Sequence, residues 1–65
     1  MQDHYRVFVD GWRVLKKYKD DPPRSDDEWR KVIKDADTFV KSCGKTDFAC
    51  DVHNAIMNEL RRLSG

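Results

Sequence analysis

The chain has 65 residues, of which 38% are hydrophobic and 38% charged, so we expect residues 1–65 to form one small domain without a separate catalytic lobe. Thirteen basic residues against twelve acidic ones give a formal charge of +1, which excludes a strong long-range field that would gather nucleic acid or anionic lipid. The first ten residues contain no apolar run of signal-peptide or membrane-spanning length, so we expect a cytoplasmic protein that does not enter a membrane.

The first predicted helix covers residues 3–19, where apolar side chains recur at helical spacing. The helix stops before Pro22 and Pro23, because a proline disfavours helical geometry at the residue that precedes it. We expect the apolar stripe centred on Trp12 to face the core; it comprises Tyr5, Phe8, Val9, Trp12 and Leu15.

A second apolar stripe on the same helix consists of Val7, Gly11, Val14 and Tyr18, over a third of a turn from the first. One interpretation is that the helix contacts both other helices and needs a wide apolar face. The other is that this second stripe stays partly exposed and contacts a second copy or another helical protein, with Gly11 permitting close backbone approach. We adopt the second stripe as the candidate protein-interaction surface.

The second predicted helix covers residues 26–43. Ser25 stands three residues before Glu28, which is the spacing of a capping box, and two aspartates between them add negative charge at the positive end of the helix dipole. Gly44 offers a left-handed cap after the last turn.

The third predicted helix covers residues 47–63, with Thr46 as its N-cap. Three amphipathic helices joined by short connections must bury their apolar stripes against one another, which predicts an all-α three-helix bundle. The predicted core consists of Phe8, Trp12, Trp29, Val32, Ile33, Ala36, Val40, Val52, Ala55, Ile56, Leu60 and Leu63.

The cysteines, Cys43 and Cys50, are too few for a disulfide framework and are interpreted as reduced thiols, although a disulfide between them stays open. Cys50 should point away from the core. It lies three residues before His53, but the sequence has no CxxC pair and no good fourth ligand, so we predict no metal and no cofactor. Acidic neighbours oppose a reactive Cys50 thiolate, and no oxyanion donors are evident, so we predict that the chain is not an enzyme.

A basic cluster of Arg13, Lys16, Lys17 and Lys19 lies at the end of the first helix. These cations complement the negative end of the helix dipole, and they are also the residues that nucleic-acid binding would use. The third helix suits a recognition helix poorly, since Asp47 and Asp51 would repel phosphate. We therefore predict a non-enzymatic protein–protein interaction or accessory module that pairs with itself or with a helical protein. Nucleic-acid binding is the alternative.

An aromatic first helix is followed by the segments SDDEWRKVIKDAD and FACDVHNAIMNELRRL. This layout resembles short all-helical bacterial proteins that are associated with mobile elements and have no assigned activity. The resemblance implies a bacterial cytosol and transfers no functional residue to this chain.

Overall fold

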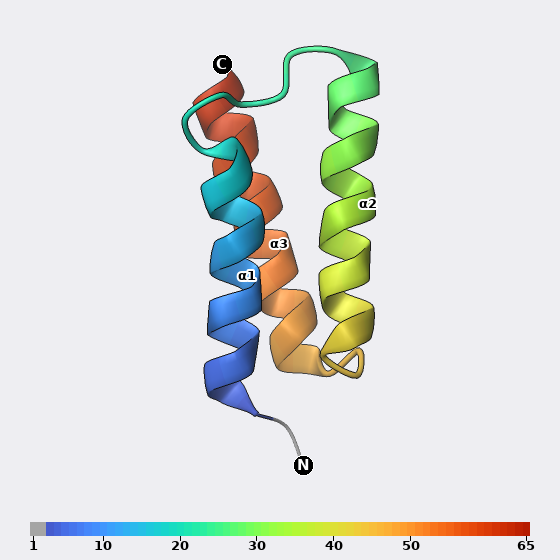
Figure 1. Cartoon of the computed structure of the whole chain (residues 1–65). Helices are drawn as coiled ribbons and strands as arrows, with labels where there is room; N and C mark the ends of the chain where they lie inside the picture. The colour runs from blue at the N-terminus through green and yellow to red at the C-terminus, as the bar shows by residue number, and fades with distance from the viewer. Residues whose placement is uncertain (1–2) are drawn as a thin grey trace.

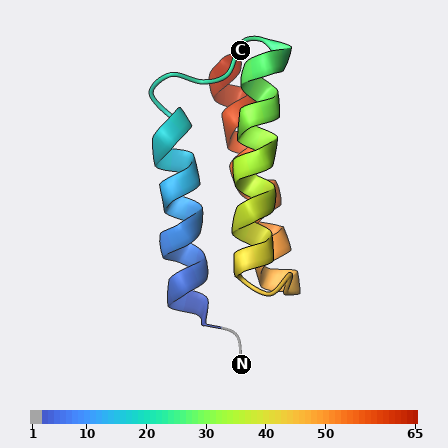
Figure 2. The same cartoon turned by 45° about the vertical axis from the view of Figure 1, so that its right-hand side comes forward.

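The computed structural model describes residues 3–65 as three helices, α1 (His4–Tyr18), α2 (Asp26–Ser42) and α3 (Asp47–Ser64). All three helices contact one another, which confirms the predicted all-α three-helix bundle. Helices α1 and α3 run in the same direction, and α2 runs antiparallel to both (Figures 1 and 2). Within residues 3–65, no helix is both long enough and apolar enough to cross a bilayer.

Each helix begins at a polar side chain that accepts a hydrogen bond from the backbone N–H three residues later. The pairs are Asp3 with Arg6, Ser25 with Glu28, and Thr46 with Ala49, each at 3.2 Å. The predicted caps at Ser25 and Thr46 are thus confirmed. The Glu28 carboxylate reaches back to accept a bond of 2.9 Å from the N–H of Arg24, the residue before the cap. These bonds satisfy backbone donors that have no partner inside a helix.

The end of α2 is a Schellman motif. Gly44 has a φ of 78°, and its N–H donates to the carbonyl of Lys41 at 3.2 Å. The N–H of Lys45 donates to the carbonyl of Val40 at 3.0 Å. This pair of bonds requires the left-handed conformation that glycine adopts without a steric cost, as the sequence predicted.

The connection between α1 and α2 is anchored on α3. Pro22 and Pro23 are both buried, and the hydroxyl of Ser64 lies 2.9 Å from the carbonyl oxygen of Pro23. The buried prolines therefore cover one end of the core, which a loop of polar residues alone would leave open.

The core is made of small and medium side chains together with one phenylalanine. Its buried members are Val7, Val14, Val32, Ala36, Phe39, Ala49, Ile56, Met57 and Leu60. The prediction was right for Val32, Ala36, Ile56 and Leu60, while Trp29, Val40 and Val52 pack partly buried against the core. It was wrong for Phe8, Trp12, Ile33, Ala55 and Leu63, which are exposed.

The orientation of α1 is the reverse of the one predicted. Val7 and Val14 are 1% and 9% exposed, Gly11 is buried, and Tyr18 is half-buried against the core, so the expectation that this stripe remains a free surface was wrong. The reason is space, because a Cβ on Gly11 would lie only 3.0 Å from Cγ1 of Val52. The same Cβ would lie 3.2 Å from Cδ1 of Ile56 and 3.4 Å from Cζ of Phe39. Side chains of α2 and α3 already fill this space and leave no room for the indole of Trp12.

Candidate interaction surface

Three large aromatic side chains of α1 lie on the outside of the bundle. Tyr5 is 71% exposed, Phe8 61% and Trp12 50%. We call the surface formed by these three residues the aromatic face. A chain this small has few large apolar side chains with which to build a core. Three neighbouring aromatic residues exposed to water therefore indicate an interaction surface more strongly than scattered exposed apolar residues do.

An apolar groove of about 210 Å³ lies beside the aromatic face, between α1 and α3. Its lining residues are all apolar: Phe8, Gly11, Trp12, Leu15, Val52 and Ile56. Pockets for small-molecule ligands usually enclose about 300–1,000 Å³, so this groove is better suited to a side chain from a protein partner. Among residues 3–65 no titratable side chain lines it, so these residues supply apolar contact area instead of acid–base chemistry.

Phe48, at the start of α3, supports one edge of the aromatic face. Its ring meets that of Phe8 edge-on, with centroids 5.3 Å apart and an interplanar angle of 77°. The ring of His4 also lies close to that of Phe48, with centroids 5.1 Å apart. Tilted aromatic contacts of this kind are favourable, so they hold Phe8 at the rim of the groove and join the N-terminal ends of α1 and α3.

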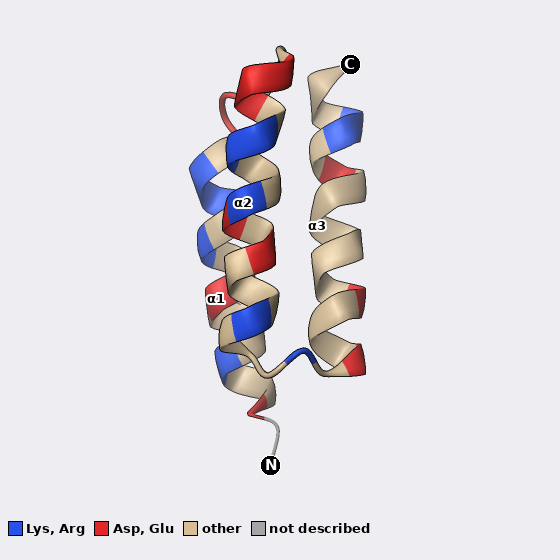
Figure 3. Cartoon of the chain, turned by 90° about the vertical axis from the view of Figure 1, so that its right-hand side faces the viewer, with Lys and Arg blue, Asp and Glu red and all other residues tan. Residues whose placement is uncertain are grey.

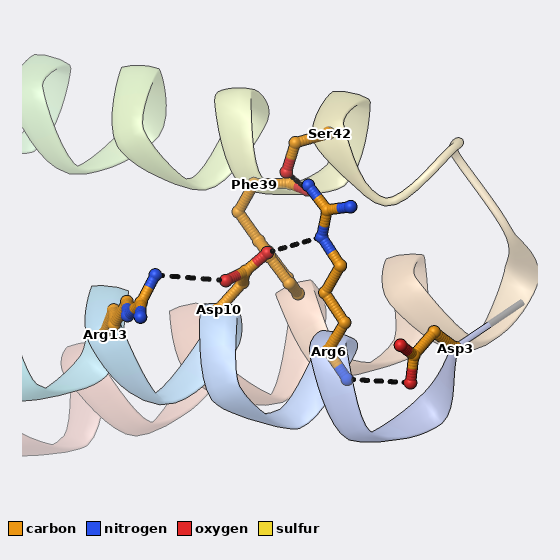
Figure 4. Close-up of polar contacts among 6 residues, drawn as sticks. All are labelled: Asp3, Arg6, Asp10, Arg13, Phe39 and Ser42. Carbon is orange, nitrogen blue, oxygen red and sulfur yellow. Dashed lines mark hydrogen bonds and ion pairs between the residues drawn. The ribbon is translucent and has the colours of Figure 1, made fainter.

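A second groove, of about 420 Å³, lies between α1 and α2; we call it the polar groove because charged and hydroxyl side chains line it together with Val14 and Phe39. Asp10 stands at its centre, 3.4 Å from Nε of Arg6 and 3.5 Å from a terminal guanidinium nitrogen of Arg13 (Figure 4). The Arg6 side chain extends across the groove toward Ser42 of α2 (Figure 4). Because Asp10 neutralises both arginines in part, the groove is not a free cationic site.

The polar groove ends at a cluster that links α1 to α2. Asp35 accepts hydrogen bonds from the Tyr18 hydroxyl and from Nζ of Lys17, the latter at 2.9 Å. The bond from Tyr18, followed by that from Lys17, lowers the pKa of Asp35 below its ordinary value of 3.8. Burial, followed by the bond to Asp35, raises the pKa of Tyr18, and the bond to Asp35 raises the pKa of Lys17. At neutral pH the carboxylate is therefore charged and both donors keep their protons.

The basic cluster predicted for nucleic-acid binding is mostly engaged with carboxylates. The pairs are Arg13 with Asp10 at 3.5 Å, Lys17 with Asp35 at 2.9 Å and Lys19 with Asp20 at 3.0 Å. Lys16 alone of the four forms no ion pair with any residue in 3–65. Phosphate would have to compete with a carboxylate at three of the four positions.

The two cysteines are free and lie in different environments. Cys43 packs partly buried against the core, whereas Cys50 is exposed on α3, as the sequence predicted for its direction. Within the described part of the chain, no three His, Cys, Asp or Glu side chains gather into a potential metal site.

The sequence analysis did not predict that the aromatic face is exposed, because both stripes of α1 are apolar and both have the residue spacing of a helix face. A signal was present in the sizes of the side chains. Val7, Gly11 and Val14 are small residues at i, i+4 and i+7, a pattern that favours close helix packing, whereas Phe8 and Trp12 on the other stripe would hold the helices further apart.

Comparison of the chain with protein-family models, with curated proteins and with solved structures gives no match. The functional interpretation therefore depends on the chemistry of the chain's own residues.

Proposed function

We propose that this protein is a non-enzymatic interaction module that binds protein through the aromatic face and the adjoining apolar groove. The observation that carries the proposal is the exposure of Tyr5, Phe8 and Trp12 next to a groove with a wholly apolar lining. Tyrosine and tryptophan are enriched at the energetic centres of protein interfaces, since they bring a large contact area at a small entropic cost.

The charged side chains support binding over catalysis. The ion pairs among residues 3–65 lie on the surface, most of them within one helix, and the apolar groove contains none of their members. The ion pairs that Arg13, Lys17 and Lys19 form with carboxylates also weaken the nucleic-acid alternative.

The two free cysteines favour a reducing compartment, so we propose that the module acts in the cytoplasm.

The proposal is tested by affinity capture and cross-linking from a native lysate of the source cells, with the wild-type chain and Trp12→Glu as baits. We expect specific partners on the wild-type bait to be lost from Trp12→Glu, because a carboxylate placed in an apolar interface is desolvated without a counter-ion. The matched control is Ile33→Glu, which replaces a side chain of similar exposure, 53%, on α2, outside the aromatic face.

Equal capture by the wild-type and Trp12→Glu chains would refute the proposal, provided that circular dichroism shows the same helicity for both. A salt-dependent complex with DNA or RNA that weakens in a Lys16→Ala, Lys17→Ala double variant would favour the nucleic-acid alternative.

A further inference from the structure

We infer that the partner seated on the aromatic face is a second copy of this chain, packed antiparallel across a twofold axis near Trp12. This inference rests on the proposed function, since it names the occupant of the same surface. It follows from the distribution of charge around the aromatic face and from the apolar area that the face exposes.

The surface formed by α1 and α3 has an acidic end and a basic end. The two helices are parallel: Phe48 at the start of α3 contacts Phe8, and Leu63 near its end shares a hollow with Leu15. Asp47 is therefore placed at the N-terminal end of this surface. Asp51 precedes Val52, which lies against Gly11, and Lys16 lies toward the other end, one helical turn beyond Trp12. Figure 3 shows acidic bands at the start of α3, and near its end a basic band with one further acidic band beside it.

Three exposed charges on α1 and α3 have no ion-pair partner among residues 3–65. Lys16, Asp47 and Asp51 are all exposed, and none of them forms an ion pair with another residue of 3–65. By contrast, Arg62 at the basic end is already held by Glu59, 2.7 Å away. One free cation and two free carboxylates thus lie on opposite sides of Trp12.

Twofold symmetry makes such a surface complementary to itself. In an isologous dimer the same patch meets itself, and an antiparallel arrangement places the basic end of each copy against the acidic end of the other. Lys16 of one copy would then face Asp51 of its partner at two equivalent places, with Trp12 close to the axis. A uniformly acidic or basic partner would match only one end and would be repelled at the other.

The exposed apolar area is enough for a modest dimer. Aromatic side chains bury about 150–250 Å² each when enclosed, so Tyr5, Phe8 and Trp12 at their observed exposure offer about 350 Å² per copy. Two copies would remove about 700 Å² at these rings alone, against about 1,200–2,000 Å² in a standard interface. The groove and the charged rim supply the remainder, which predicts a weak, reversible dimer.

The first experiment is sedimentation equilibrium of the purified chain at low salt, from about 10 μM to about 1 mM, a range that brackets a weak dissociation constant. We expect a monomer–dimer equilibrium that Trp12→Glu abolishes and Ile33→Glu leaves unchanged, with equal helicity in all three chains. A wild-type chain that stays monomeric throughout would overturn the inference, and so would a dimer that Trp12→Glu leaves intact.

The second experiment tests the antiparallel arrangement by charge reversal. Lys16→Glu and Asp51→Lys should each weaken self-association by about tenfold, because each places two like-charged pairs in the dimer. Mixing the two variants should restore association, since both contacts of the mixed dimer are then attractive. Mixed chains that associate no better than the separate variants would overturn the arrangement.

Failure of this inference and failure of the proposed function give different results. A monomeric chain whose capture of a cellular partner still depends on Trp12 would refute self-association and retain the interaction module. If neither dimerisation nor capture of a partner changes in the Trp12→Glu chain, both the self-association and the interaction module would be refuted.

Discussion

Asp35 is the residue whose charge most directly joins α1 to α2, because it accepts hydrogen bonds from both Tyr18 and Lys17. Its side chain is about a third exposed, so solvent screens the ion pair with Lys17 considerably. The hydrogen bond from Tyr18 is less accessible to water and contributes more to holding the two helices together. We expect Tyr18→Phe to cost about 1 kcal/mol of unfolding free energy, measured by urea denaturation.

The same cluster predicts how stability changes in acid. The folded-state pKa of Asp35 lies below the ordinary value of 3.8, so the unfolded chain takes up this proton first as the pH falls. The stabilisation is therefore complete above the unfolded pKa and is lost as the pH falls through the folded one. Between about pH 5 and about pH 2, wild type should lose more unfolding free energy than Asp35→Asn. Parallel losses in the two chains would contradict this assignment.

At the scale of the helices, local chemistry decides where each element begins and ends. The Ser25 hydroxyl caps α2, and three acidic residues follow it at the positive end of the helix dipole. Ser25→Ala should lower the unfolding free energy by about 1 kcal/mol, as measured by chemical denaturation. Ser25→Asp is the matched control, since aspartate is an equally good N-cap. An equal loss in both variants would mean that the side-chain cap is not what stabilises α2.

This local chemistry explains why the helix boundaries could be predicted from the sequence and the face of α1 could not. The caps at Ser25 and Thr46 and the turn at Gly44 depend on a few neighbouring residues. The burial of Val14 instead of Trp12 depends on how closely α1 approaches α3, which periodicity does not encode. The sequence analysis therefore assigned the interaction surface to the stripe of Val14, which is buried, whereas the exposed stripe is that of Trp12.

At the scale of the whole molecule, the core is thin, and each buried side chain contributes a large share of the stability. A chain of 65 residues has an unfolding free energy of about 3–10 kcal/mol. Ile56→Ala should remove about 2–5 kcal/mol, because Ile56 is buried, whereas Ile33→Ala should remove less than about 1 kcal/mol. The two variants delete the same atoms, so comparable losses in thermal or chemical denaturation would disprove the assigned orientation of α2 or α3.

The central claim is that α1 buries its small stripe and presents its aromatic stripe to a partner. The most direct measurement compares the cooperative unfolding of Val14→Glu and Trp12→Glu with that of wild type, at a concentration low enough to keep each chain monomeric. We expect Val14→Glu to lose cooperative folding, since a carboxylate buried without a partner costs several kcal/mol, and Trp12→Glu to keep its helicity and cooperative transition. If Val14→Glu folded and Trp12→Glu did not, the account would be contradicted, because that result would show that the aromatic stripe is the one buried in the core.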